Sequence, residues 1–317
     1  MRIPGSDSML VFSTSDKGGT GRSVTSCNIA YRLCLRGHDV AYVDFDFGSP
    51  TAGALFEIGR VERGTTEGLG MHSYLSDVVG EPARLNVDRA TDRLDLRRNP
   101  PGAGKLVLFP GDEGGAEFGC DDAMVERAAM LLSSLLGEFS VVMVDLSAGR
   151  SVALEIALRA TVTDMLRQIR HRWLVFHRWT HQHVLAAGGL VHGDHGLIKT
   201  GEFWGHDGPR LLASTRCVRT AVPESEHKDE DSADHDDRAP LDVWLDEQAI
   251  MLRQLATKHR VGAARVLGQT PIEPMLQWRE QLILDVDVDA QLANEATVEA
   301  YTNLARRLTN KATWDIE

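Results

Sequence analysis

A glycine-rich loop at residues 17–23, with the sequence KGGTGRS, constrains the fold of this chain more than any other feature. An apolar run typical of a strand precedes the loop at 9–14, and apolar residues at helical spacing follow it at 23–36. Glycines allow backbone N–H groups to turn toward one centre, and the N-terminus of the following helix adds positive potential. An ordinary glycine-rich turn is the alternative, but seven consecutive matching positions between a strand and a helix favour a phosphate-binding loop.

Apolar runs of strand length alternate with helical patterns along the chain. This alternation predicts the α/β class, with a doubly wound, mainly parallel sheet and helices on both faces. A length of 317 residues is enough for one large domain, and we expect residues 1–317 to form it. The expected strands are 9–14, 40–45, 105–109, 141–144, 173–176 and 211–214, and the expected helices are 23–36, 123–136, 180–191, 241–259 and 296–308.

The charge balance of the chain argues against nucleic acid as the main partner. Lys and Arg total 34 against 46 Asp and Glu, a net charge of -12, which repels phosphate backbones at long range. One compact basic cluster, Arg167, Arg170, His171 and Arg172, leaves DNA binding open, but we interpret it as the end of a helix. Residues 223–238 hold eight acidic and two basic side chains and predict a disordered loop.

The sequence indicates neither a membrane span nor a cysteine or histidine metal site. No stretch approaches the roughly 20 apolar residues of a membrane helix, so we expect a cytoplasmic protein without a membrane partner. The four cysteines are scattered, and the seven histidines between 171 and 206 have no carboxylate or cysteine at zinc-ligand spacing. We therefore interpret these cysteines as buried thiols and these histidines as surface side chains.

The loop and three further segments of the sequence resemble those of the deviant Walker A ATPases of the ParA and MinD superfamily. The loop fits the form KGGxGK[ST], in which a lysine stands at the front, better than it fits the general Walker pattern, and it has Arg22 in place of the second lysine. The sequence VDFDFG at 43–48 resembles the family's switch I, and 141–145 with Leu146 and Ser147 resembles its Walker B strand and the start of switch II. TPIEP at 270–274 resembles the proline loop that borders the adenine. The resemblance implies ATP and Mg2+ as ligands.

The resemblance also implies a role for individual residues. Lys17 is expected to reach across a two-fold interface to the nucleotide of a second copy, and Asp46 to position the attacking water. Mg2+ is expected at Ser23, Asp44 and Asp145, with the carboxylates acting through water. The chemistry of Asp145 supports this, because a carboxylate at the end of a buried strand is costly without a cation or donors nearby. The predicted nucleotide contacts are Lys17, Gly18, Gly19, Thr20, Gly21, Arg22, Ser23, Val24, Pro271 and Pro274.

Two departures from the family pattern leave two functions open. Arg22 replaces the lysine that usually contacts the β- and γ-phosphates, and a planar fork is not equivalent to an ammonium. Val24 lacks a hydroxyl that many members carry. The first function is an ATP-binding, Mg2+-dependent nucleotide switch with slow hydrolysis, which forms a homodimer on ATP to control a protein partner. The second is a non-enzymatic adaptor of P-loop ancestry, which binds nucleotide weakly or not at all.

Overall fold

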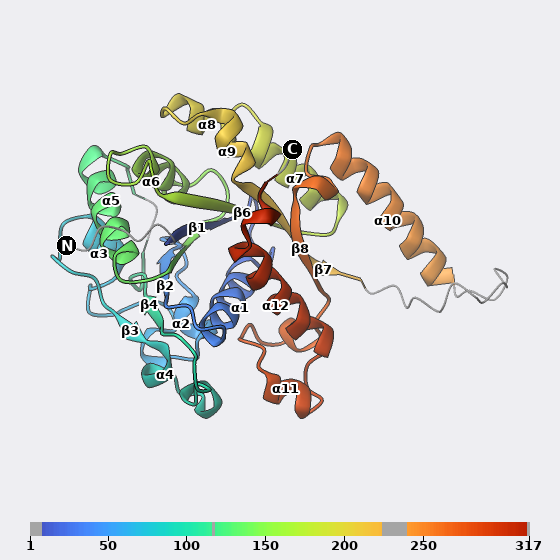
Figure 1. The fold of residues 1–317 in the computed structure, drawn as a ribbon, viewed down its shortest axis with the longest axis horizontal. Helices are drawn as coiled ribbons and strands as arrows, with labels where there is room; N and C mark the ends of the chain where they lie inside the picture. The colour runs from blue at the N-terminus through green and yellow to red at the C-terminus, as the bar shows by residue number, and fades with distance from the viewer. Residues whose placement is uncertain (1–7, 116–117, 224–239, 316–317) are drawn as a thin grey trace.

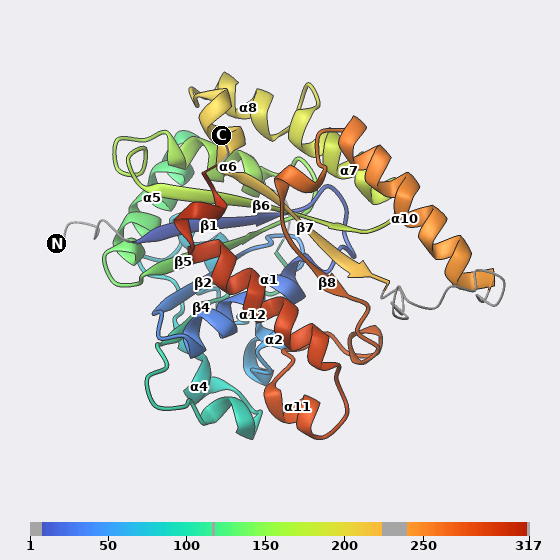
Figure 2. The same ribbon diagram turned by 45° about the vertical axis from the view of Figure 1, so that its right-hand side comes forward.

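The described part of the chain folds around one mainly parallel sheet of eight strands, seen from two directions in Figures 1 and 2. The computed structural model describes residues 8–115, 118–223 and 240–315. The strand order is β3-β4-β2-β5-β1-β6-β7-β8, and only β3 pairs antiparallel among the described strands. The predicted α/β class is confirmed. The strands are β1 (Met9–Thr14), β2 (Val40–Phe45), β3 (Leu85–Asn86), β4 (Leu106–Phe109), β5 (Val141–Leu146), β6 (Arg170–Arg178), β7 (Thr215–Val222) and β8 (Val266–Pro271).

Helices cover both faces of the sheet, because successive side chains of each central strand point to opposite faces. Met9 and Val11 of β1 pack in one core with α1 and α12, whereas Leu10 and Phe12 pack in the other with α5, α6 and α7. No helix formed by the described residues is long and apolar enough to cross a membrane. The helices are α1 (Arg22–Leu35), α2 (Ala52–Leu55), α3 (Met71–Leu75), α4 (Val87–Ala90), α5 (Asp122–Leu136), α6 (Val152–Thr161), α7 (His181–His192), α8 (Leu197–Phe203), α9 (Gly208–Ala213), α10 (Pro240–Lys258), α11 (Asp285–Asp289) and α12 (Glu295–Thr309).

Strands β2, β5 and β1 lie at the centre of the sheet, with their carboxyl ends side by side. Every residue of these strands is buried, as their continuous apolar runs predict. The parallel register sets Ser13 of β1 beside Asp145 of β5, and Asp145 beside Asp44 of β2. In open α/β sheets, ligands bind outside the carboxyl ends of the strands, at the point where the strand order reverses. The glycine-rich loop leaves β1 at that point.

Three expectations for the second half of the chain are wrong. The histidines between 171 and 206 are not all surface side chains, because His177 on β6 is only 1% exposed. Residues 211–214 do not form a strand, because Asp207 caps helix α9 by accepting the N–H of Arg210 at 2.7 Å, and β7 begins only at Thr215. The basic cluster does not end a helix either, since α6 ends at Thr161 and residues 170–172 open β6. The predicted acidic loop at 223–238 lies, except for its first residue, outside the described residues.

The side chain of Trp173 packs β6 against β1, the strand that leads into the glycine-rich loop. It is fully buried and stacks on Phe12 with ring centroids 4.3 Å apart. Trp173→Ala is expected to lower the free energy of unfolding by about 3–5 kcal/mol, because it removes a large apolar surface and leaves a cavity. Urea unfolding measures the loss. Trp278→Ala, at a side chain that is 93% exposed, is the control and should stay within about 0.5 kcal/mol of the parent. Equal losses in the two variants would contradict this account of the core.

Candidate functional site

The glycine-rich loop connects β1 to α1 at the carboxyl edge of the sheet. Gly19 and Gly21 have φ angles of +69° and +73°, a region that favours glycine. The hydroxyl of Thr220 on β7 donates to the carbonyl of Thr20 at 2.6 Å, and its side chain lies 3.8 Å from where a Cβ of Gly21 would stand. The loop is therefore held against β7 in a conformation that its glycines make accessible.

Helix α1 begins at Arg22 and directs its N-terminus toward this loop. Its first turn contains no acidic residue, and no side chain among the described residues caps it at Gly21. The backbone N–H groups at such a helix end are left for an anion, and the helix dipole favours negative charge there. The N-terminus of α1 is thus open to an anion, and phosphate binding at this loop stays a prediction.

Arg22 does not point out of the site but forms ion pairs inside it. Its Nε donates to Asp145 Oδ1 at 2.7 Å, and its Nη2 donates to Asp46 Oδ2 at 2.7 Å and to Ser23 Oγ at 3.2 Å. Burial alone lowers the pKa of the guanidinium, but the carboxylates of Asp145 and Asp46 outweigh that effect and raise the pKa. The guanidinium therefore stays charged, as the counter-ion of two of the three predicted site acids.

Asp44 is the third acid, and no ion pair joins it to a cation among the residues that the structure describes. Its Oδ1 accepts the N–H of Asp46 at 3.1 Å and its Oδ2 accepts the N–H of Ala52 at 3.2 Å. Burial, followed by the negative charges of Asp145 and Asp46, raises the pKa of Asp44 to about 8 from its ordinary 3.8. Burial also raises the pKa of Asp145, while Arg22 acts in the opposite direction. The surroundings of Asp44 therefore favour its protonated form at neutral pH.

A cavity of about 310 Å3 lies beside the loop and is large enough for part of a nucleotide. The predicted contacts that line it are Gly19, Thr20, Gly21, Val24 and Pro271. Residues that sequence reasoning missed line it as well, among them Arg178 at the end of β6, Thr220 on β7, and Gln277, Glu280 and Tyr301. Ligands bind at the carboxyl ends of parallel strands, so the ends of β6 and β7 were candidates for the cavity wall. The incorrect position expected for β7 concealed them.

Five of the predicted nucleotide contacts do not line this cavity: Lys17, Gly18, Arg22, Ser23 and Pro274. Lys17 is exposed at the front of the loop, and Pro274 is exposed and does not line the cavity. Near Lys17, the loop is joined to the segment after β5, where Asp16 pairs with Arg150 at 2.8 Å. The roles expected of Lys17 and Pro274 stay predictions.

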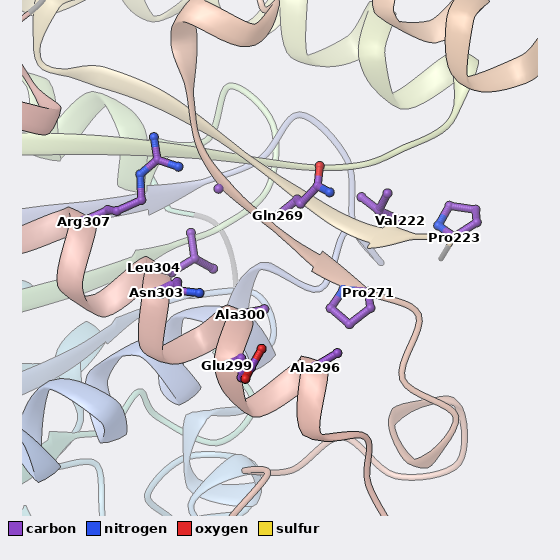
Figure 3. A pocket seen from close by; sticks show the side chains of 11 residues that line it. Val222, Pro223, Gln269, Pro271, Ala296, Glu299, Ala300, Asn303, Leu304 and Arg307 are labelled. Atoms are coloured by element: carbon purple, nitrogen blue, oxygen red, sulfur yellow. The ribbon is translucent and has the colours of Figure 1, made fainter. Parts of the chain in front are cut away.

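Larger hollows lie elsewhere on the molecule. Figure 3 shows one of about 480 Å3 between β8 and α12, with Gln269 on the strand and Asn303 and Arg307 on the helix. Another, of about 670 Å3, lies between α10 and the edge of the sheet and is lined by Trp179 and Trp244. Neither is lined by the glycine-rich loop or by the N-terminus of α1. The smaller cavity beside the loop is therefore the candidate for a phosphate-bearing ligand.

The side chains around Arg22 suit a hard cation in their chemistry. The hydroxyl of Ser23 and the carboxylates of Asp44 and Asp145 are oxygen donors of the kind that Mg2+ prefers. Arg22 is bonded to Ser23 and Asp145, so its guanidinium must move before these oxygens can serve a metal. Within the described ranges, no group of three or more His, Cys, Asp or Glu side chains is arranged to hold a metal ion. A cation held by one serine hydroxyl, with carboxylates acting through water, does not require such a group.

Comparison with known proteins agrees with this geometry. The chain matches the family described as "CobQ/CobB/MinD/ParA nucleotide binding domain" over residues 11–309. No match is found among curated proteins. Similar solved structures include the MinC:MinD cell division protein complex of Aquifex aeolicus, with a TM-score of 0.57 and 16% identity over 95% of each chain. A ParA family ATPase of Chlorobium tepidum TLS has a TM-score of 0.54 and 13% identity over 95% of this chain and 99% of that chain.

A third structure is the septum site-determining protein MinD of Pyrococcus horikoshii OT3, complexed with Mg-ADP. Its TM-score is 0.50, with 14% identity over 95% of each chain. Identities this low show a shared fold only. The family match covers nearly the whole chain, including the glycine-rich loop and the ends of β2 and β5. The chain therefore belongs to the CobQ/CobB/MinD/ParA family of nucleotide-binding domains.

Proposed function

We propose that residues 1–317 act as one nucleotide-switched ATPase unit, which binds ATP with Mg2+ and hydrolyses it slowly to ADP and phosphate. The main support is the meeting of the glycine-rich loop, the open N-terminus of α1 and the strand-end acids Asp44 and Asp145 at one edge of the sheet. The likeness in fold to a MinD that carries Mg-ADP agrees with this choice of ligands.

In this proposal the loop is a deviant Walker A motif whose backbone N–H groups hold the β-phosphate. The cavity beside the loop takes the base and ribose, with Pro271 at its border. Ser23 ligates Mg2+ directly, and Asp145 and Asp44 hold its water ligands. The metal supplies positive charge to the phosphate oxygens. Arg22 serves the phosphates once it has left Asp145.

Hydrolysis in this proposal depends on the orientation of one water molecule. Phosphoryl transfer requires a positioned nucleophile more than a strong base. Asp46 is the carboxylate to which we assign the positioning of the water. Asp46 is paired with Arg22, so it becomes available for the water only after the guanidinium moves. Slow turnover follows from this requirement.

We also propose that ATP brings two copies together through Lys17. The exposure of Lys17 at the front of the loop supports a contact outside its own chain. A dimer formed in this way would present a surface to a protein partner, as the complex of MinD with MinC illustrates for a protein of similar fold. DNA is a less favoured partner, because the chain carries a net charge of -12.

The adaptor function is the second candidate, and one observation favours it. Asp145, which is expected to serve the metal, and Asp46, which is expected to serve the attacking water, are already paired with Arg22. In an adaptor this arrangement would be permanent, and no phosphate would be released from ATP. A steady-state assay of phosphate release from ATP distinguishes the two candidates.

Ser23→Ala is expected to weaken the affinity for ATP about tenfold or more in the presence of Mg2+, because the variant loses a metal ligand. It should leave the affinity in EDTA nearly unchanged. Calorimetry with and without Mg2+ measures both values. Ser134→Ala, on the exposed side of α5, is the matched control. If the parent binds ATP equally well with and without Mg2+, the metal assignment is wrong.

Lys17→Ala is expected to abolish ATP-dependent dimerisation while nucleotide affinity stays within about fivefold, as for removal of one exposed charge. Sedimentation velocity with a non-hydrolysable ATP analogue measures the oligomeric state. Lys258→Ala, at the end of α10, is the control and should still dimerise. A parent that stays monomeric at saturating analogue would refute the sandwich dimer, and so would a dimeric Lys17→Ala variant.

The proton on Asp44 predicts a pH dependence of stability. Because the folded-state pKa of about 8 lies above the ordinary 3.8, the folded chain holds this proton more tightly than the unfolded chain. The contribution to stability is complete below about pH 4 and is lost as the pH rises through 8. In Asp44→Asn, which resembles the protonated acid, the free energy of unfolding should fall less between pH 5 and 8 than in the parent. Urea unfolding across this range tests it, and parallel curves would show that Asp44 is ionised throughout.

A further inference from the structure

All three nitrogens of the Arg22 guanidinium lie within hydrogen-bond distance of other side chains. Nε bonds to Asp145, Nη2 bonds to Asp46 and Ser23, and Nη1 lies 3.5 Å from Ser15 Oγ. The side chain is only 7% exposed. A phosphate group needs the same donors in the same planar fork, so Arg22 cannot make these bonds and serve a phosphate at once.

These bonds fasten three separate segments to one another. Arg22 is the first residue of α1, Asp145 lies near the end of β5, and Asp46 follows β2. Asp46 also accepts the N–H of Ser49 at 3.3 Å, so the pair with Arg22 extends to the turn behind it. A lysine has all its donors on one atom, whereas the arginine fork can reach two carboxylates on two segments. The arginine is therefore suited to a task that the usual lysine is not.

We infer that Arg22 is a latch: it closes the phosphate site by binding Asp145 and Asp46, and a nucleotide must displace these acids from the guanidinium before Arg22 can bind its phosphates. The inference rests on the proposed function and names the event that regulates it. The two acids are both largely buried, so opening the latch leaves them without their counter-ion. The observed nucleotide affinity equals the intrinsic affinity multiplied by the fraction of open molecules. Weakening the latch should therefore strengthen nucleotide binding.

The test is a titration with a fluorescent N-methylanthraniloyl ADP in EDTA, so that no metal contributes. Asp46→Asn keeps the shape of the side chain and removes the charge that binds Nη2. It should tighten binding about tenfold, the effect of losing one charge-assisted hydrogen bond from the closed state. Asp285→Asn is the matched control, because it removes the same charge from a pair with Arg32 farther along α1. This control should bind like the parent.

A second background separates the latch from simple repulsion between Asp46 and phosphate. In Arg22→Lys the fork is gone but the positive charge remains, so Asp46→Asn should change affinity less than about threefold there. A gain of the same size in both backgrounds, or an equal gain in Asp285→Asn, would overturn the latch. Thermal unfolding checks that each variant folds.

Binding kinetics test the latch independently of the Arg22→Lys background. In stopped-flow mixing, the observed rate for the parent should level off at high nucleotide as opening becomes limiting, and Asp46→Asn should raise that plateau several-fold. Rates that rise linearly with nucleotide in both proteins would overturn the inference. If no variant binds nucleotide at all, the proposed function fails together with the latch. If binding occurs but Asp46→Asn has no effect on affinity or plateau, only the latch fails.

Discussion

A guanidinium buried between two carboxylates is the interaction on which the arrangement of the site depends. A buried charge is tolerated only with a partner, and Arg22, Asp145 and Asp46 supply one another with partners. Asp44 is paired with no cation in the described part of the chain, and burial beside the other two acids raises its pKa instead. The carboxyl edge of the sheet thus carries three acids without carrying three uncompensated charges. A ligand that binds the Arg22 guanidinium leaves Asp145 and Asp46 without their counter-ion, so the charge of these acids must then be compensated in another way.

The sheet makes this interaction possible by bringing distant segments into one register. Arg22 and Asp145 are separated by 123 positions in the chain, and they meet because β5 lies directly beside β1. Strand β2 pairs with β5 on the other side, which places Asp44 next to Asp145. Strand β7 adds Thr220, whose hydroxyl holds the loop from the opposite side. The loop therefore lies against residues from four strands, and a ligand bound there would contact several of them.

The parts of the fold that follow local rules were predictable. Strands β1 and β2 occur at the expected residues, because each is a continuous apolar run buried on both faces. The loop was recognisable because its glycines and its position between strand and helix act locally. By contrast, residues 211–214 were assigned to a strand, since a run of four residues has no period that separates strand from helix. That error displaced β7 and concealed Thr220 and the neighbouring wall of the cavity.

The sequence by itself determined the α/β class, the phosphate-binding loop and the acids at the ends of β2 and β5, because periodicity, glycine content and strand ends are properties of short segments. Only the tertiary structure decided what Arg22 does. Read along the chain, Arg22 replaces a lysine and is expected to serve phosphates. In the folded protein it bonds to Asp145, which lies in β5, and to Asp46, which follows β2. The direction of a long side chain depends on the charges that packing brings within reach, and those charges are not local in sequence.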